Sequence, residues 1–139
     1  MSGFLLDTNV LSEPTKKRPN PGVIEWLETL PDDLIYVSVI SLGEIRRGID
    51  RLASAKKKST LERFLFDVNL RYSQNTLAVD TKVADRWGRL VDSLEKARSN
   101  LTPADALIAA TALEHSLTIA SRDADFYAVA GVSRFNSFR

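Results

Sequence analysis

Four carboxylic acids, spread along the whole chain, are the residues of this sequence best suited to chemistry: Asp7, Glu44, Asp105 and Asp123. Carboxylate oxygens are the ligands that Mg²⁺ and Mn²⁺ prefer in proteins. A divalent cation held in this way lowers the pKa of a bound water and offsets charge on a phosphodiester. If the chain brings the four acids together, they therefore predict a metal site at which all four serve as metal ligands and catalytic groups for phosphodiester hydrolysis.

Three of these acids also have a purely structural interpretation. Ser41 and Glu44 have the spacing of a helix capping box, and Thr102 and Asp105 nearly have it. Carboxylates in a first helical turn also suit the helix dipole. Asp123 fits the N-cap of a short helix. Any one of these acids could be a helix cap by chance. Four acids at one place are less easily explained by chance, and this favours the metal site.

Other catalytic mechanisms lack the residues they need. The chain has one histidine, His115, at the end of a predicted helix, where a surface role is expected. A two-histidine ribonuclease mechanism and a Ser-His-Asp triad are therefore disfavoured. Without cysteine there is no disulfide, no thiolate zinc site and no cysteine nucleophile. Neither glycine-rich phosphate-binding motif is present, so a nucleotide-cofactor fold is unsupported.

The composition is that of an ordinary globular protein, and the 139 residues predict one domain over 1–139. No apolar stretch approaches the roughly 18 residues of a membrane span, and no signal segment is visible, so we expect a cytoplasmic protein without a membrane partner. The formal net charge is only +1. Basic residues nevertheless cluster, either as solvated faces or as local patches for a polyanion. The clusters are Lys16-Lys17-Arg18, Arg46-Arg47 with Arg51, and Lys56-Lys57-Lys58.

Short apolar runs alternate with helical patterns along the chain. Strands are predicted at 4–6, 34–39, 76–79, 117–120 and 132–135. Helices are predicted at 21–30, from 41 to about 53, from about 59 to 72, from 81 to about 98, at 103–115 and around 124–130.

This alternation predicts an α/β fold with three αβα layers around a mainly parallel sheet of about four to five strands. Ligands bind beyond the carboxyl ends of the strands in such sheets. Asp7 directly follows the first strand, where a buried carboxylate is costly unless it is paired or binds a cation. Glu44 and Asp123 follow two other strands, and Asp105 opens a helix. All four are therefore expected at one edge of the sheet.

Four segments resemble the acidic motifs of PIN-domain ribonucleases, in the family's order and over nearly the whole chain. They are Leu5-Leu6-Asp7-Thr8-Asn9-Val10-Leu11, Ser41-Leu42-Gly43-Glu44-Ile45-Arg46-Arg47-Gly48, Pro103-Ala104-Asp105-Ala106-Leu107-Ile108-Ala109-Ala110-Thr111-Ala112 and Ile119-Ala120-Ser121-Arg122-Asp123-Ala124-Asp125-Phe126. The third is the most specific. The subgroup that the chain resembles is the VapC-type and FitB-like toxins of bacterial toxin–antitoxin pairs.

The resemblance implies a PIN-like fold, dependence on Mg²⁺ or Mn²⁺, and endoribonuclease activity on RNA. It also implies a homodimer and inhibition by a cognate antitoxin that carries a DNA-binding domain.

By position, the resemblance also assigns supporting residues around the four acids. Thr8 and Asn9 match polar neighbours that orient the first aspartate or bound water, and Ser121 matches a hydroxyl near the metal. Many relatives have asparagine where Asp123 stands and a different spacing to the following Asp-Phe. Asp125 therefore either shares the role of Asp123 or only caps a turn.

The two adjacent arginines of the second motif have two interpretations. Arg46 and Arg47 either contact RNA phosphates or only coat the surface of a helix.

Two other functions stay open from the residues alone. An aspartate after the first strand also serves as the nucleophile of phosphatases and phosphoacceptor domains. The Asp-x-Asp pattern of one such class is broken here by Asn9, and a receiver domain wants a lysine where Ser121-Arg122 stands. The second alternative is a non-catalytic domain that binds RNA or a partner and uses its acids only as caps.

Overall fold

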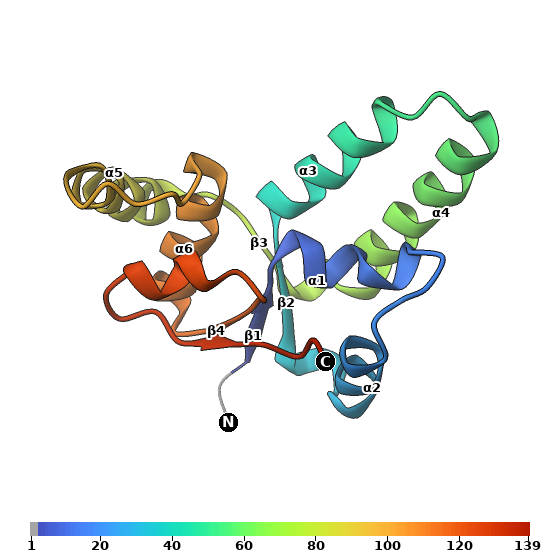
Figure 1. Ribbon diagram of the computed structural model, residues 1–139, viewed down its shortest axis with the longest axis horizontal. Coiled ribbons are helices and arrows are strands. Elements are labelled where there is room, and N and C mark those ends of the chain that lie inside the picture. The colour runs from blue at the N-terminus through green and yellow to red at the C-terminus, as the bar shows by residue number, and fades with distance from the viewer. Residues whose placement is uncertain (1–2) are drawn as a thin grey trace.

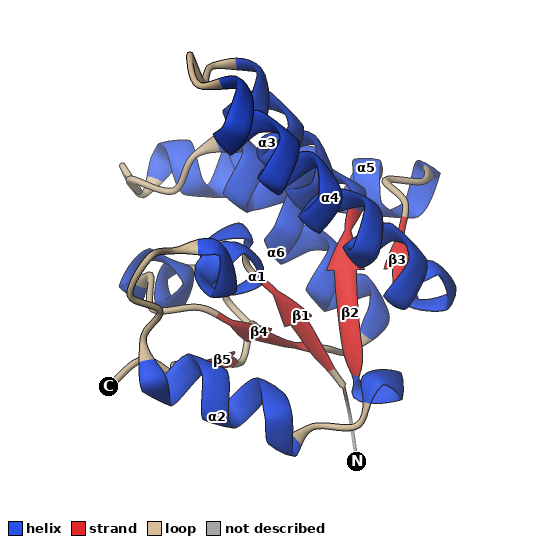
Figure 2. Ribbon diagram, turned by 90° about the vertical axis from the view of Figure 1, so that its right-hand side faces the viewer, coloured by secondary structure: helices blue, strands red, loops and turns tan. Residues whose placement is uncertain are grey.

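A parallel five-stranded sheet forms the centre of the molecule in a computed structural model, which describes residues 3–139 apart from the side chains of 127 and 128 (Figures 1 and 2). The strands are β1 (Phe4–Leu6), β2 (Ile35–Ser38), β3 (Thr76–Leu77), β4 (Thr118–Ala120) and β5 (Arg134–Phe135). Their order is β3-β2-β1-β4-β5, and all four pairings are parallel. The predicted α/β class is confirmed. Successive strands are added on one side of β1 up to β3 and on its other side from β4 onward, so the strand order reverses between β1 and β4. At such a switch point the carboxyl ends of parallel strands leave a crevice.

Helices cover both faces of this sheet, which gives the three predicted layers (Figure 1). They are α1 (Thr8–Ser12), α2 (Pro21–Thr29), α3 (Val39–Asp50), α4 (Ala55–Arg71), α5 (Thr81–Lys96) and α6 (Pro103–His115). Shorter 3₁₀ turns lie at Glu13–Thr15, Asp32–Leu34, Ser73–Asn75 and Ala124–Ala128.

The alternation of side chains along β1 builds a separate core on each face. Leu6 belongs to the core formed with helices α1 to α4, whereas Leu5 belongs to the core formed with α5 and α6. Both leucines are almost completely buried.

Two helices begin earlier than the sequence pattern predicted. Ser38, not Ser41, is the N-cap of α3, because its backbone is extended and its Oγ accepts the Ile40 N–H at 3.0 Å. The predicted capping box of Ser41 and Glu44 is therefore wrong, and Glu44 lies in the second helical turn rather than the first. Ser54 likewise caps α4, so the lysine run at 56–58 lies inside that helix. In both cases a serine ahead of the apolar periodicity determines the start.

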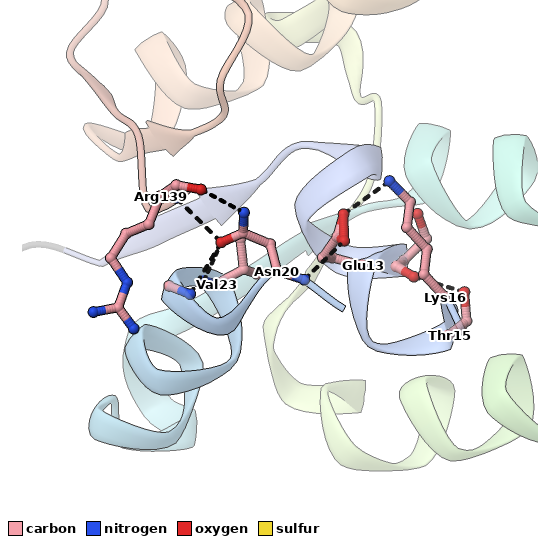
Figure 3. Close-up of polar contacts among 8 residues, drawn as sticks. Glu13, Thr15, Lys16, Asn20, Val23 and Arg139 are labelled. Atoms are coloured by element: carbon pink, nitrogen blue, oxygen red, sulfur yellow. Dashed lines mark hydrogen bonds and ion pairs between the residues drawn. The ribbon is translucent and has the colours of Figure 1, made fainter. Parts of the chain in front are cut away.

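The last residues of the chain pack against the beginning of α2 (Figure 3). Asn20, the N-cap of α2, accepts the N–H groups of Gly22 and Val23 through Oδ1. Its Nδ2 donates to the carbonyl of Arg139 at 2.9 Å, and the Arg139 N–H donates back to Oδ1 at 3.1 Å. A Cβ at Gly22 would lie 2.5 Å from the Ser137 carbonyl oxygen, so only glycine permits this approach.

No helix in the described range is both long enough and apolar enough to cross a lipid bilayer.

Candidate metal centre

Asp7 lies at the centre of the site, directly after the middle strand. Its N–H donates to the Ala120 carbonyl at 3.0 Å and so extends the pairing of β1 with β4. Asp7 is only 5% exposed, and its carboxylate accepts hydrogen bonds from Ser121 Oγ at 2.7 Å and from the Thr8 N–H at 2.8 Å. Burial raises the pKa of Asp7 above its usual value. The charges of Glu44 and Asp123 raise this pKa further, and the two hydrogen bonds oppose the shift.

Glu44 is held next to Asp7 through two hydroxyl groups. Thr8 Oγ1 lies 2.6 Å from Glu44 Oε1 and 3.0 Å from Ser41 Oγ. Because threonine has one hydroxyl hydrogen, and the bond to a carboxylate is the stronger, Thr8 donates to Glu44 and Ser41 can donate to Thr8. Ser41 is completely buried. It therefore orients Glu44 through Thr8 and does not cap the helix.

Asp105 reaches the site from the first turn of α6. Helices in parallel α/β folds run opposite to the strands, so this helix begins at the carboxyl edge of the sheet. Thr102 is the N-cap, and its Oγ1 accepts the Asp105 N–H at 3.1 Å, as the sequence predicted. The pKa of Asp105 is raised to about 6, first by burial and then by the charge of Asp7, with smaller contributions from Glu44 and Asp123; a hydrogen bond with Thr102 opposes the shift.

Asp123 lies three residues beyond β4 and is tied to Asp7 through Ser121. The Asp123 N–H donates to Ser121 Oγ at 2.9 Å, and the same Oγ donates to Asp7. Asp123 also caps the turn Ala124–Ala128 by accepting the Asp125 N–H at 2.9 Å, so its structural interpretation is correct as well. Asp125 itself is exposed.

The charge of this group is not neutralised by basic side chains. Within residues 3–139 none of the four acids forms an ion pair with lysine, arginine or histidine. Their mutual effect on pKa shows that all four share one neighbourhood. Hard oxygen donors with uncompensated charge fit Mg²⁺ or Mn²⁺. No three histidine, cysteine, aspartate or glutamate side chains among the described residues form a ready-made metal cage, so a cation would have to draw the carboxylates closer.

The remaining predicted residues are less closely tied to this group. Asn9 is exposed, and no hydrogen bond joins its side chain to Asp7 in the described part of the chain, so its orienting role stays a prediction. Arg46 Nη1 lies 3.6 Å from Glu62 Oε1 of α4, whereas Arg47 is exposed on another face of α3. His115 is exposed at the end of α6 opposite Asp105, about 15 Å away along the helix axis at 1.5 Å per residue.

The sequence revealed neither the role of Ser41 nor the contact of the Thr8 hydroxyl with Glu44, since it assigned Thr8 to Asp7 or bound water. The spacing of Ser41, three residues before Glu44, is also the spacing of a capping box. The available signal is Ser38, a second possible N-cap at the end of the preceding strand, which would leave Ser41 free for another role.

Comparison with known proteins agrees with this arrangement. A family model described as "PIN domain" matches residues 4–132. Toxin FitB of Neisseria gonorrhoeae is 38% identical over 134 residues, which are 96% of either chain. Ribonuclease VapC4 of Mycobacterium tuberculosis is 33% identical over 69% of this chain and 72% of its own. The crystal structure of FitAcB from Neisseria gonorrhoeae superposes with a TM-score of 0.89 at 36% identity, covering 96% of this chain and 97% of that one. This chain belongs to the PIN-domain family.

Proposed function

We propose that this protein is an endoribonuclease that depends on Mg²⁺ or Mn²⁺ held by Asp7, Glu44, Asp105 and Asp123. The proposal is supported by four carboxylates that lie near enough to affect one another's pKa and that form no ion pair with a described basic side chain. Its relatives include a protein named as a ribonuclease and a protein named as a toxin. When bound, the cation would supply a Lewis acid that makes water a nucleophile near neutral pH and offsets charge on the phosphodiester.

The protein's own groups divide the work of positioning. Ser121 and the Thr8 N–H each donate to one oxygen of Asp7, so the orientation of the Asp7 carboxylate is fixed. Thr8 fixes one oxygen of Glu44 and leaves the other for a ligand. Asp105, at a helix N-terminus, and Asp123, at a turn, complete the set of four acids. Orientation of this kind by neighbouring hydroxyls typically changes metal affinity or activity by about 10–100-fold.

We further infer that the chain is the toxin of a toxin–antitoxin pair, acts in the cytoplasm and forms a homodimer. Its likeness to Toxin FitB and to FitAcB supports the antitoxin partner, which we expect to carry a DNA-binding domain. An apolar cavity of about 350 Å³ between α1, α2 and α4, lined in part by Leu11, Leu27 and Phe64, offers a partner a docking surface. Co-purification with the product of a neighbouring small reading frame tests for the antitoxin partner. The molar mass from light scattering tests for the homodimer.

The central experiment is cleavage of defined RNAs by the purified protein, with and without EDTA. We expect cleavage that EDTA abolishes and Mn²⁺ or Mg²⁺ restores, with 5′-phosphate and 3′-hydroxyl ends. Asp7→Asn and Asp105→Asn should each abolish it while the circular dichroism of the fold is retained. Full activity of both variants contradicts the proposal.

The two alternatives give different results in the same preparation. A phosphoacceptor domain would form a phospho-aspartate that can be trapped on Asp7, and it would leave RNA intact. A non-catalytic domain would neither cleave RNA nor bind Mn²⁺ in a titration.

A further inference from the structure

One face of α3 continues outward from Glu44 as a stripe of four residues. In a helix of 3.6 residues per turn, the positions three, four and seven residues after Glu44 lie on its own face. These positions are Arg47, Gly48 and Arg51. Arg51, the C-cap, keeps a helical backbone with φ −81° and ψ −13°, so the stripe reaches the end of the helix. It extends about 10 Å from Glu44, at about 1.5 Å per residue, as α3 leaves the sheet (Figure 1).

The two arginines of this stripe, Arg47 and Arg51, are exposed. Neither Arg47 nor Arg51 forms an ion pair with any residue that the structure describes. Arg46 differs, because it lies beside Glu62 of α4. Between the two arginines a Cβ at Gly48 would meet nothing within 4 Å, so the surface there is open to a ligand.

A structural role alone gives a different expectation for these arginines. Basic residues near a helix C-terminus complement the helix dipole, and their loss then lowers stability without affecting any ligand. Arg47 and Arg51 both lie near that end of α3. An anionic ligand at the carboxylates, however, needs positive charge beside a strongly negative group. Arginine supplies that charge together with bidentate contacts to phosphate.

We propose that Arg47 and Arg51 bind the phosphates that flank the cleaved bond, so that the RNA strand leaves the carboxylates along the exposed face of α3. This proposal rests on the ribonuclease function proposed above. It assigns Arg51 and the open surface at Gly48 to substrate binding, and it separates Arg47 from its neighbour Arg46.

Binding of a short fluorescein-labelled single-stranded RNA, measured by anisotropy in an Asp105→Asn background, tests the proposal without cleavage. Each phosphate contact to single-stranded nucleic acid contributes about 0.7 to the slope of log affinity against log salt concentration. At about 0.1 M salt, Arg47→Ala and Arg51→Ala should therefore each weaken binding about fivefold, and the double variant about 25-fold, with a salt slope lower by about 1.4. In the cleaving protein the same substitutions should raise KM and leave kcat nearly unchanged.

Two other arginines serve as comparisons of equal charge. Arg63→Ala, on α4, should leave binding unchanged, and Arg46→Ala should cost less than Arg51→Ala. Equal losses from Arg46→Ala and Arg51→Ala would mean that only total charge matters and would overturn the proposed path. So would unchanged binding by the Arg47→Ala/Arg51→Ala variant, with thermal unfolding confirming that each variant is folded.

Failure of this path can be told apart from failure of the proposed function. If the unsubstituted protein cleaves RNA while both arginine variants bind and cleave normally, only the path is wrong. If the unsubstituted protein cleaves no RNA but the arginine variants still lose binding, the ribonuclease function is wrong, and only RNA binding by Arg47 and Arg51 stands.

Discussion

Replacing Asp105 by asparagine should raise the stability of the metal-free protein at neutral pH, although it removes a group on which we expect cleavage to depend. The reason is the raised pKa of this carboxyl, about 6 against an ordinary 3.8. A carboxyl whose pKa is higher in the folded state binds its proton more tightly there. The contribution of this carboxyl to the free energy of unfolding should therefore be complete below about pH 4 and should be lost as the pH rises through about 6. An asparagine at 105 does not titrate and avoids this loss.

The pKa difference sets the size of the effect. A shift of roughly two units corresponds to about 3 kcal/mol at most, at about 1.36 kcal/mol per unit. Asp105 is only partly buried, and solvent screening reduces such a value, so we expect about 1 kcal/mol. For a domain of this length that is a rise of about 3 °C in Tm.

The assay is thermal unfolding in EDTA at pH 7.5 and at pH 4.0, for the natural chain and for Asp105→Asn. The stability advantage of the variant should be larger at pH 7.5 than at pH 4.0. Adding Mn²⁺ should stabilise the natural chain more than the variant, because only the natural chain retains all four ligands. Asp85→Asn, an exposed carboxyl on α5 paired with Arg89, is the matched control and should change Tm little at either pH. An advantage that does not grow with pH, or equal stabilisation of both chains by Mn²⁺, would refute this reasoning.

Three further predictions concern other parts of the structure. Thr8→Val removes the hydroxyl that holds Glu44 and should weaken Mn²⁺ binding about tenfold in calorimetry, whereas Thr8→Ser should retain it; equal affinities would show that the 2.6 Å contact does not orient Glu44. Asp125→Asn should retain nearly full cleavage because this side chain is exposed and only its N–H contacts Asp123, whereas Asp123→Asn should lose most activity; the reverse result in the RNA assay would give the ligand role to Asp125. Gly22→Ala should lower the free energy of unfolding by about 1–3 kcal/mol in urea, because its Cβ would lie 2.5 Å from the Ser137 carbonyl oxygen. Gly88→Ala, in open space on α5, should raise it by about 0.5–1 kcal/mol; similar changes in both would contradict the packing at Gly22.

Much of this arrangement follows from local patterns that the sequence displays. Asn20 ahead of Pro21 predicts a helix start because both residues satisfy the first turn, and the structure has that start. Asp7 directly follows an apolar run that predicts a strand, and parallel strands share one carboxyl edge of the sheet. The sequence therefore predicts Asp7 at that edge, and the structure places it at that edge.

Other parts depend on contacts that no local pattern encodes. Ser41 and Ser38 are both good caps, and the sequence could not rank them because the choice depends on where β2 stops pairing with its neighbours. The hydroxyl contacts of Thr8 with Glu44, and of Ser121 with Asp7, join segments 36 and 114 residues apart. Only the assembled sheet brings them within reach of each other.

The placement of β1 between β2 and β4 has a consequence for how the protein is made. Asp7 leaves the ribosome 114 residues ahead of Ser121, which directly follows β4 and donates to its carboxylate. Until that strand inserts, the central carboxylate lacks a hydrogen-bond donor and the turn that carries Asp123. A growing chain that has not yet reached Asp123 therefore cannot contain the finished centre.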